Sequence, residues 1–198
     1  MGVLGPLIDY YVEPETKGGE LFDSLKPPVI FASNHQSHMD TPTILKSMPG
    51  PWRRKTAALA AADYFFRNRL VATLVSLSFA TVPIERKGGR AKENNERIER
   101  LLKESWNLLI YPEGTRSRSG EPGVLRSGVA AMALEHAVPI VPIHVAGTHD
   151  AMPVGRVWPK KHPVTVSFAA PIEPSPADDR RSLMAQLTEA MAQMRSAG

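Results

Sequence analysis

The chain has 198 residues, of which 42% are hydrophobic, and its formal net charge at pH 7 is +4. This length predicts a single domain over residues 1–198, and the positive charge favours an acidic partner such as a phosphorylated metabolite or an anionic membrane. The absence of cysteine excludes disulfides, cysteine–zinc sites and thiol nucleophiles, and the few aromatic residues with no long basic block argue against nucleic acid as a partner.

The start of the chain, residues 1–26, is expected to be a short N-terminal lead-in. It lacks the basic start and long apolar run of a signal peptide. The longest uncharged run, Leu70–Ile84, covers 15 residues, fewer than the roughly 20 apolar residues that a spanning helix needs. We therefore expect no transmembrane helix and leave attachment to a membrane surface open.

Short apolar runs alternate with helical patterns along the chain. Strands are expected at Val29–Ser33, Thr56–Ala60, Thr81–Ile84, Asn107–Tyr111, Val138–Val145 and Val164–Phe168. Helices are expected from about Thr41, over Asp63–Ser78, Ala91–Glu104 and Ser127–His136, and in a closing helix (Pro176–Met194) within residues 176–198. This alternation predicts an α/β domain with a mostly parallel sheet flanked by helices. In such sheets, ligands bind where strands end and loops turn into helices.

Two histidines and an aspartate follow the first expected strand, in the segment "SNHQSHMD". A turn between a strand and a helix can bring Asp40 back onto the ring of His35, which fixes the tautomer of the imidazole and makes its other nitrogen a better base. No serine or cysteine nucleophile is evident beside this pair. A His–Asp pair of this kind can instead activate a hydroxyl group carried by the substrate.

Two other interpretations of this segment stand beside the catalytic one. Asp40 or Thr41 can simply cap the following helix, with Pro42 in its first turn. The segment also has a partial likeness to the ligand pattern of metallo-hydrolases. In that case His35, His38 and Asp40 would bind a metal with ligands added from His144, His149 and Asp150.

A second group of functional residue types lies in "YPEGTRSRSGEPGVLRSG", Tyr111 to Gly128, between an expected strand and an expected helix. Arg116, Arg118 and Arg126 crowd this loop, and a guanidinium binds phosphate oxygens in a two-point fork. Gly114 permits a tight turn. The pattern indicates a pocket for a phosphate monoester, and the simpler alternative is a basic loop in solvent, with Glu113 paired to Arg116.

These segments resemble the glycerolipid acyltransferases, most closely the 1-acylglycerol-3-phosphate O-acyltransferases. Four blocks occur in the order found in that family. The first is the His-x4-Asp block from His35 to Asp40, and the third is "YPEGTR" from Tyr111 to Arg116. The second, "ATVPIER", supplies Arg86, and the fourth, "VPIVPI", supplies Pro142. The resemblance implies a fold like that of glycerol-3-phosphate acyltransferase.

The resemblance also implies roles for individual residues. His35 would be the general base and Asp40 its orienting partner. The acceptor site and its phosphate would involve Arg86, Glu113, Gly114, Thr115 and Arg116, and Arg126 is a weaker candidate for the phosphate. The donor would be an acyl thioester, either acyl-CoA or acyl carrier protein, with no resident cofactor and no metal.

The expected activity is acyl transfer to the free hydroxyl of lysophosphatidic acid, with glycerol 3-phosphate or another lipid hydroxyl as the alternative acceptor. Different classes of function remain as rivals: a metal-dependent phosphoesterase, or a non-catalytic module that binds anionic membranes. Many relatives carry a lysine in the segment after the second strand, whereas "AALAAADYFF" has none. Many relatives also carry an N-terminal pair of helices that lies in the membrane, and the 34 residues before His35 show no matching pattern.

Contact with lipid is therefore expected to be peripheral, on the inner face of the cell membrane, for a cytoplasmic protein. Two tryptophans lie beside basic residues, in "PWRRK" (Trp52 to Lys55) and "VWPKK" (Trp158 to Lys161). A further apolar segment runs from Asp63 to Val75. Tryptophan favours the boundary between water and lipid, and the alternative is that both tryptophans pack on the core.

Overall fold

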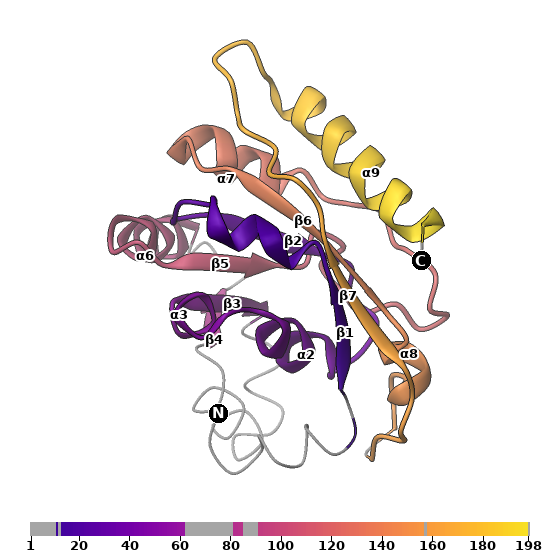
Figure 1. Cartoon of the computed structure of the whole chain (residues 1–198). Coiled ribbons are helices and arrows are strands. Elements are labelled where there is room, and N and C mark those ends of the chain that lie inside the picture. Colours follow the sequence, from indigo (N-terminus) through magenta and orange to yellow (C-terminus); the bar gives the residue numbers. More distant parts are fainter. Residues whose placement is uncertain (1–10, 12, 62–80, 85–90, 157, 198) are drawn as a thin grey trace.

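The computed structural model describes residues 11, 13–61, 81–84, 91–156 and 158–197 (Figure 1). Within this part of the chain one sheet has the strand order β1-β7-β6-β2-β5-β3-β4. The strands are β1 Pro14–Lys17, β2 Ile30–Ser33, β3 Thr56–Ala61, β4 Thr81–Ile84, β5 Asn107–Ile110, β6 Ile140–Ala146 and β7 Val164–Phe168. Neighbouring strands are parallel except β6 and β7, which are antiparallel. The predicted mostly parallel sheet is confirmed.

The helices are η1 Gly19–Asp23, α2 Asp40–Ser47, α3 Gly50–Arg54, α6 Ala91–Lys103, α7 Gly128–His136, α8 Thr148–Ala151 and α9 Arg180–Ser196. The helix predicted over Asp63–Ser78 lies outside the described residues. The closing helix α9 begins later than Pro176 because Asp179 caps it. The Asp179 carboxylate accepts a hydrogen bond from the Ser182 N–H at 2.7 Å, and the Ser182 hydroxyl accepts one from the Asp179 N–H at 3.0 Å.

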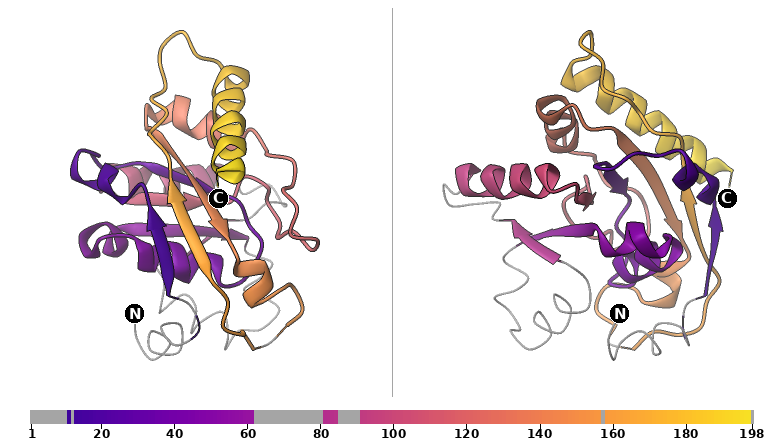
Figure 2. Two further views of the ribbon diagram at one scale, coloured as in Figure 1. Left: turned by 45° about the vertical axis from the view of Figure 1, so that its right-hand side comes forward. Right: turned by 60° about the vertical axis from the view of Figure 1, so that its left-hand side comes forward.

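The central strand β2 divides the core into two layers because successive side chains of a strand point to opposite faces. Phe31 belongs to an apolar cluster that η1, α2 and α3 cover. Ile30 and Ala32 belong to a second cluster that α6, α7 and α9 cover. Figures 1 and 2 show these two groups of helices on opposite faces of the sheet. All four residues of β2 are buried, which explains why the strand is uniformly small or apolar.

The expected N-terminal lead-in contributes to the sheet. Its strand β1 pairs in parallel with β7, from Pro14 opposite Val164 to Lys17 opposite Ser167. The sequence "PETK" carries no alternation of apolar and polar residues, so a pattern-based prediction does not detect it. The 3-10 helix η1 then places Phe22 in the core.

The carboxyl ends of β2, β3, β5 and β6 lie at one edge of the sheet because these strands are parallel. The turn after β2, the loop after β5 and the helix α8 after β6 all leave the sheet at this edge. We call it the carboxyl edge. Among the described helices, none is both long enough and apolar enough to cross a membrane.

Candidate active site

A hydrogen bond joins His35 and Asp40 at the carboxyl edge. His35 follows β2, Asp40 is the first residue of α2, and His35 Nδ1 lies 2.8 Å from Asp40 Oδ2. The Asp40 side chain is fully buried and that of His35 is 20% exposed. Because a carboxylate only accepts hydrogen bonds, we infer that Nδ1 carries the proton and that Nε2 has a lone pair for a substrate.

The Asp40 carboxylate is held by further donors. Its Oδ2 accepts hydrogen bonds from the N–H groups of Gln36 at 2.7 Å and Ser37 at 2.8 Å. Its Oδ1 accepts one from the Thr148 hydroxyl of α8 at 2.5 Å. The N-cap position of α2 is Met39, which makes no side-chain cap hydrogen bond. The structure therefore shows Asp40 organising the turn and the ring of His35, and not acting as the helix cap.

The backbone of His35 is fixed by the loop that follows β5. Its N–H donates to Glu113 Oε1 at 2.9 Å, and its carbonyl accepts from the Ser117 N–H at 2.8 Å. Glu113 is only 6% exposed, and its Oε2 accepts from the Gly123 N–H at 2.8 Å. Glu113 thus joins the histidine turn to both ends of this loop, a role that its place in the sequence does not indicate.

Asn34 extends the sheet by one residue beyond β2. Its side-chain amide donates to the Val145 carbonyl at 2.9 Å, and its side-chain oxygen accepts from the Val145 N–H at 2.8 Å. The Asn34 side chain therefore makes the same two hydrogen bonds to β6 that a backbone residue of a paired strand would make. It sets the direction in which the chain leaves β2, and therefore the position of His35.

Tyr111 packs flat against the imidazole of His35. The two ring centroids are 3.9 Å apart and the rings are inclined by 17°. The Tyr111 hydroxyl and the Thr41 hydroxyl lie 2.7 Å apart. Burial, together with the negative charge of Asp40, raises the pKa of Tyr111 well above its ordinary value, so the phenol stays protonated near neutral pH. The stacked Tyr111 ring restrains one face of the imidazole, whereas Asp40 holds the ring through Nδ1.

His38 differs from His35 in its surroundings. Desolvation and the nearby positive charge of Arg116 lower the pKa of His38 to about 4, so its ring is neutral at pH 7. His38 is exposed at the surface, where solvent screens part of the charge of Arg116. Among the residues that the structure describes, no three His, Asp or Glu side chains form a group able to hold a metal ion. The metal-binding interpretation therefore finds no ligand set in this part of the chain.

The loop after β5, residues 111–127, surrounds an open hollow of about 440 Å³; we call this segment the arginine loop. Glu113, Thr115, Arg116, Ser117, Gly123 and Arg126 contribute to its lining. The loop is closed at its base, where the Arg126 N–H donates to the Pro112 carbonyl at 2.9 Å. Two guanidinium groups and several hydroxyl groups thus lie around one concave surface, together with the carboxylates of Glu113 and Glu121. Glu113 and Ser117 connect this surface directly to His35.

Gly114 is required by the conformation of the arginine loop. Its φ of +76° lies in the left-handed region, and a Cβ atom there would stand 3.0 Å from Arg126 Nε. The glycine therefore permits both the turn and the close approach of the Arg126 side chain.

The structure brings together most of the residues that the sequence singled out. His35, Asp40 and Glu113 form one hydrogen-bonded unit, and Gly114, Thr115, Arg116 and Arg126 belong to the adjoining arginine loop. Pro142 lies in β6, opposite Ala32 of β2. Arg86 lies outside the described residues.

Sequence comparison supplies the decisive observation on the family. The family model described as Acyltransferase matches residues 13–146, a range that includes β2, the histidine turn and the whole arginine loop. The chain belongs to the acyltransferase family. This confirms the resemblance noted from the four sequence blocks.

Individual relatives agree with this family. The chain is 29% identical to the chloroplastic 1-acyl-sn-glycerol-3-phosphate acyltransferase BAT2 of Brassica napus, covering 85% of this chain and 47% of the relative. It is 30% identical to the chloroplastic 1-acyl-sn-glycerol-3-phosphate acyltransferase LPAT1 of Arabidopsis thaliana, covering 82% of this chain and 44% of the relative. It is 27% identical to the human 1-acyl-sn-glycerol-3-phosphate acyltransferase alpha, covering 71% and 48%. The chain thus spans about half the length of these curated relatives.

A solved structure supports the fold independently. The crystal structure of the 1-acyl-sn-glycerophosphate (LPA) acyltransferase PlsC from Thermotoga maritima superimposes with a TM-score of 0.74 at 23% sequence identity. The match covers 96% of this chain and 75% of that one. The acyltransferase family and the observed sheet are therefore consistent with each other.

Proposed function

We propose that this protein transfers a fatty acyl group from an acyl thioester, either acyl-CoA or acyl carrier protein, to the free hydroxyl of lysophosphatidic acid, giving phosphatidic acid. The observation that carries the proposal is the His35–Asp40 hydrogen bond beside the arginine loop, in a chain of the acyltransferase family. The names of the relatives, 1-acyl-sn-glycerol-3-phosphate acyltransferases, support this acceptor.

In this proposal His35 is the general base. Its Nε2 removes the proton from the acceptor hydroxyl while that oxygen forms a bond to the thioester carbonyl carbon. Asp40 holds the ring through Nδ1 and stabilises the imidazolium that forms. The C–S bond then breaks, and the departing thiolate takes from His35 the proton that came from the acceptor hydroxyl. Free thiols have pKa values of about 8.5, so the leaving group needs no strong acid and the step needs no resident cofactor.

The arginine loop would bind the phosphate of the acceptor. Arg116 and Arg126 line its hollow, and the family resemblance adds Arg86. Guanidinium groups form charge-assisted, two-point hydrogen bonds with phosphate oxygens. Arg116 lies close enough to His38, two residues before Asp40, for its positive charge to lower the pKa of His38. A phosphate on Arg116 would therefore lie close to the histidine turn, within reach of the hydroxyl that His35 must contact.

The test offers the purified protein acyl-CoA together with lysophosphatidic acid or glycerol 3-phosphate in parallel reactions. Thiol release gives the rate, and mass spectrometry of the lipid product gives the acceptor. We expect phosphatidic acid as the main product, unaffected by a chelator. Preference for glycerol 3-phosphate would change the acceptor. Release of inorganic phosphate, lost on chelation, or lipid binding without thiol release from either donor, would refute the proposal.

We further propose that this reaction takes place at the inner face of the cell membrane, with the protein in the cytoplasm and bound peripherally. The physical reason is that acceptor and product are both lipids, whereas the donor is water-soluble. An enzyme at the bilayer surface meets both without extracting the lipid completely.

A further inference from the structure

The two tryptophans that lie beside basic residues have different surroundings. Trp52 is half-buried, with its ring 5.3 Å from that of Phe22 and 6.3 Å from that of Phe31, measured between centroids. It packs against the core, as the simpler interpretation predicts. Trp158, in contrast, is 67% exposed. The structure therefore leaves one tryptophan available for contact with a partner.

Trp158 belongs to a strongly basic loop, Met152 to His162, which we call the Trp158 loop. Arg156, Lys160 and Lys161 are exposed beside the tryptophan. The chain contains no aspartate or glutamate between residues 151 and 172. A bulky aromatic ring is thus exposed in a segment whose charged residues are all basic.

The loop is held in place at its base. The Lys160 N–H donates to the Ala151 carbonyl at 2.9 Å, and β6 and β7 pair on either side of the loop, with Ala146 opposite Thr165. The Ser37 hydroxyl of the histidine turn donates to the Met152 carbonyl at 2.7 Å. These hydrogen bonds place the base of the loop beside the proposed active site.

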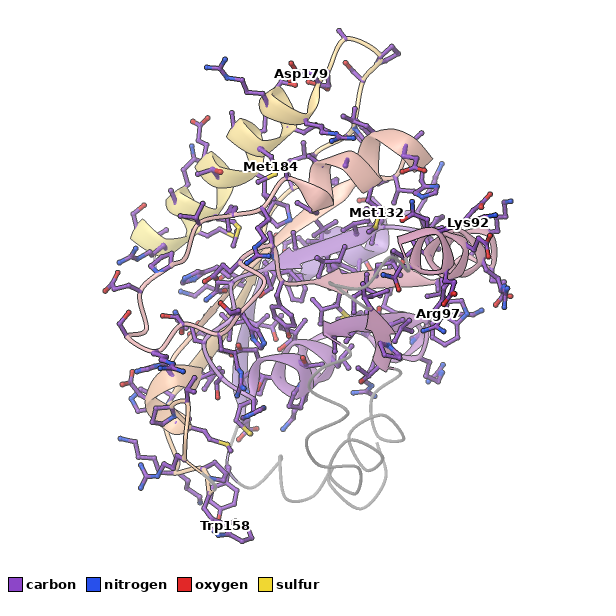
Figure 3. All side chains as sticks on the ribbon, turned by 180° about the vertical axis from the view of Figure 1, so that it is seen from behind. Lys92, Arg97, Met132, Trp158, Asp179 and Met184 are labelled. Atoms are coloured by element: carbon purple, nitrogen blue, oxygen red, sulfur yellow. The ribbon has the colours of Figure 1, made fainter. Side chains whose placement is uncertain are left out.

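The loop leaves the sheet at the carboxyl edge, because it follows β6 and α8. The two large hydrophobic side chains that are exposed in the described part of the chain, Val124 at 89% and Trp158, both lie on loops of this edge. Figure 3 shows Trp158 at the opposite end of the molecule from Asp179, the residue before α9. Trp158 is therefore exposed on a loop of the edge that also carries the proposed active site.

We propose that the Trp158 loop is the surface on which the protein rests against an anionic lipid bilayer. The Trp158 ring would insert at the boundary between head groups and acyl chains, where the ring is apolar and its N–H stays hydrated. Arg156, Lys160 and Lys161 would face the anionic head groups. This deepens the proposed function and rests on it, since a lipid acceptor is the reason for membrane contact. With the loop on the bilayer, the carboxyl edge faces the membrane.

The first test is sedimentation with phosphatidylcholine vesicles that contain or lack phosphatidylglycerol. We expect binding to the anionic vesicles, release at high salt, and little binding to the neutral ones. One cation near an anionic surface strengthens binding about fivefold, so the double variant Lys160→Gln/Lys161→Gln should bind about thirtyfold more weakly. The matched control, Arg180→Gln/Arg181→Gln, removes the same charge from exposed positions at the start of α9 and should bind like the wild type.

The second test follows tryptophan fluorescence with anionic vesicles whose acyl chains carry bromine. Quenching is expected in the wild type and should be lost in Trp158→Phe, although Trp52 and Trp106 remain. Thermal unfolding of each variant checks that the fold is intact. Equal weakening in both double variants, or quenching that survives Trp158→Phe, would overturn the inference. Wild-type turnover without vesicle binding would overturn it, together with the proposed peripheral location, and leave the proposed acyl transfer standing. Vesicle binding without any turnover would refute the proposed acyl transfer.

Discussion

Replacing Glu113 by glutamine tests whether this residue organises the site or contacts the acceptor. The Glu113 carboxylate accepts one hydrogen bond from the His35 N–H and another from the Gly123 N–H, at 2.9 and 2.8 Å. A glutamine side chain has nearly the same shape, but its NH₂ group cannot accept. One of the two N–H groups therefore loses its partner, and the other faces a neutral oxygen. The change should loosen the connection between the histidine turn and the arginine loop.

The size of the effect follows from the hydrogen bonds involved. A hydrogen bond to a charged group contributes about 1.5–3 kcal/mol, and for a chain of this size that loss lowers Tm by about 3–12 °C. We expect kcat to fall as well, since His35 is no longer held, while the KM for the acceptor changes little. Calorimetry and steady-state kinetics with varied acceptor measure both quantities. A raised acceptor KM with unchanged Tm would show that Glu113 binds the acceptor and would refute the anchoring role.

Three further changes are expected to act in different ways. Arg116→Ala should raise the KM for the acceptor much more than that for the donor, because it removes a charge-assisted partner of the phosphate; unchanged acceptor saturation in both this variant and Arg86→Ala would place the phosphate elsewhere. Asp40→Asn removes the charge from a buried group that accepts four hydrogen bonds, so both Tm and kcat should fall, and a variant with wild-type values would contradict the role assigned to Asp40. The pKa of His38 is about 4 in the folded protein against an ordinary 6.5, so the unfolded chain takes up the proton first and stability is lost as the pH falls from 6.5 to 4. His38→Gln should flatten the decrease of Tm across that window, by a modest amount because the ring is exposed, and an unchanged slope would mean that His38 does not contribute.

The parts of the fold that could be predicted from the sequence are those with a local signal. Strands such as Asn107–Ile110 and Val164–Phe168 are short apolar or alternating runs, and they form where expected. Helices α3 and α8 have five and four residues, too short for a helical periodicity to appear. The contact between His35 and Asp40 was predictable because only five positions separate them, so a single turn suffices to bring them together.

The contacts that complete the site join distant parts of the chain. Glu113 reaches His35 across 78 positions, and Thr148 reaches Asp40 across 108. These contacts arise because parallel strands end at a common edge, and no pattern within either segment reveals which partner the other will supply. Tyr111 belongs to the sequence block "YPEGTR", yet its stacking on His35 follows only from the pairing of β2 with β5.

The role of His35 as general base is tested most directly by the rate of thiol release from acyl-CoA with lysophosphatidic acid as acceptor. The rate is compared among the wild type, His35→Ala and the neighbouring control His38→Ala, with thermal unfolding to verify each fold. Loss of a general base lowers the rate by about 10²–10⁴-fold, and we expect such a loss for His35→Ala, with most activity kept in His38→Ala. Wild-type turnover in His35→Ala would contradict the proposed mechanism, and equal losses in both variants would favour a metal site instead.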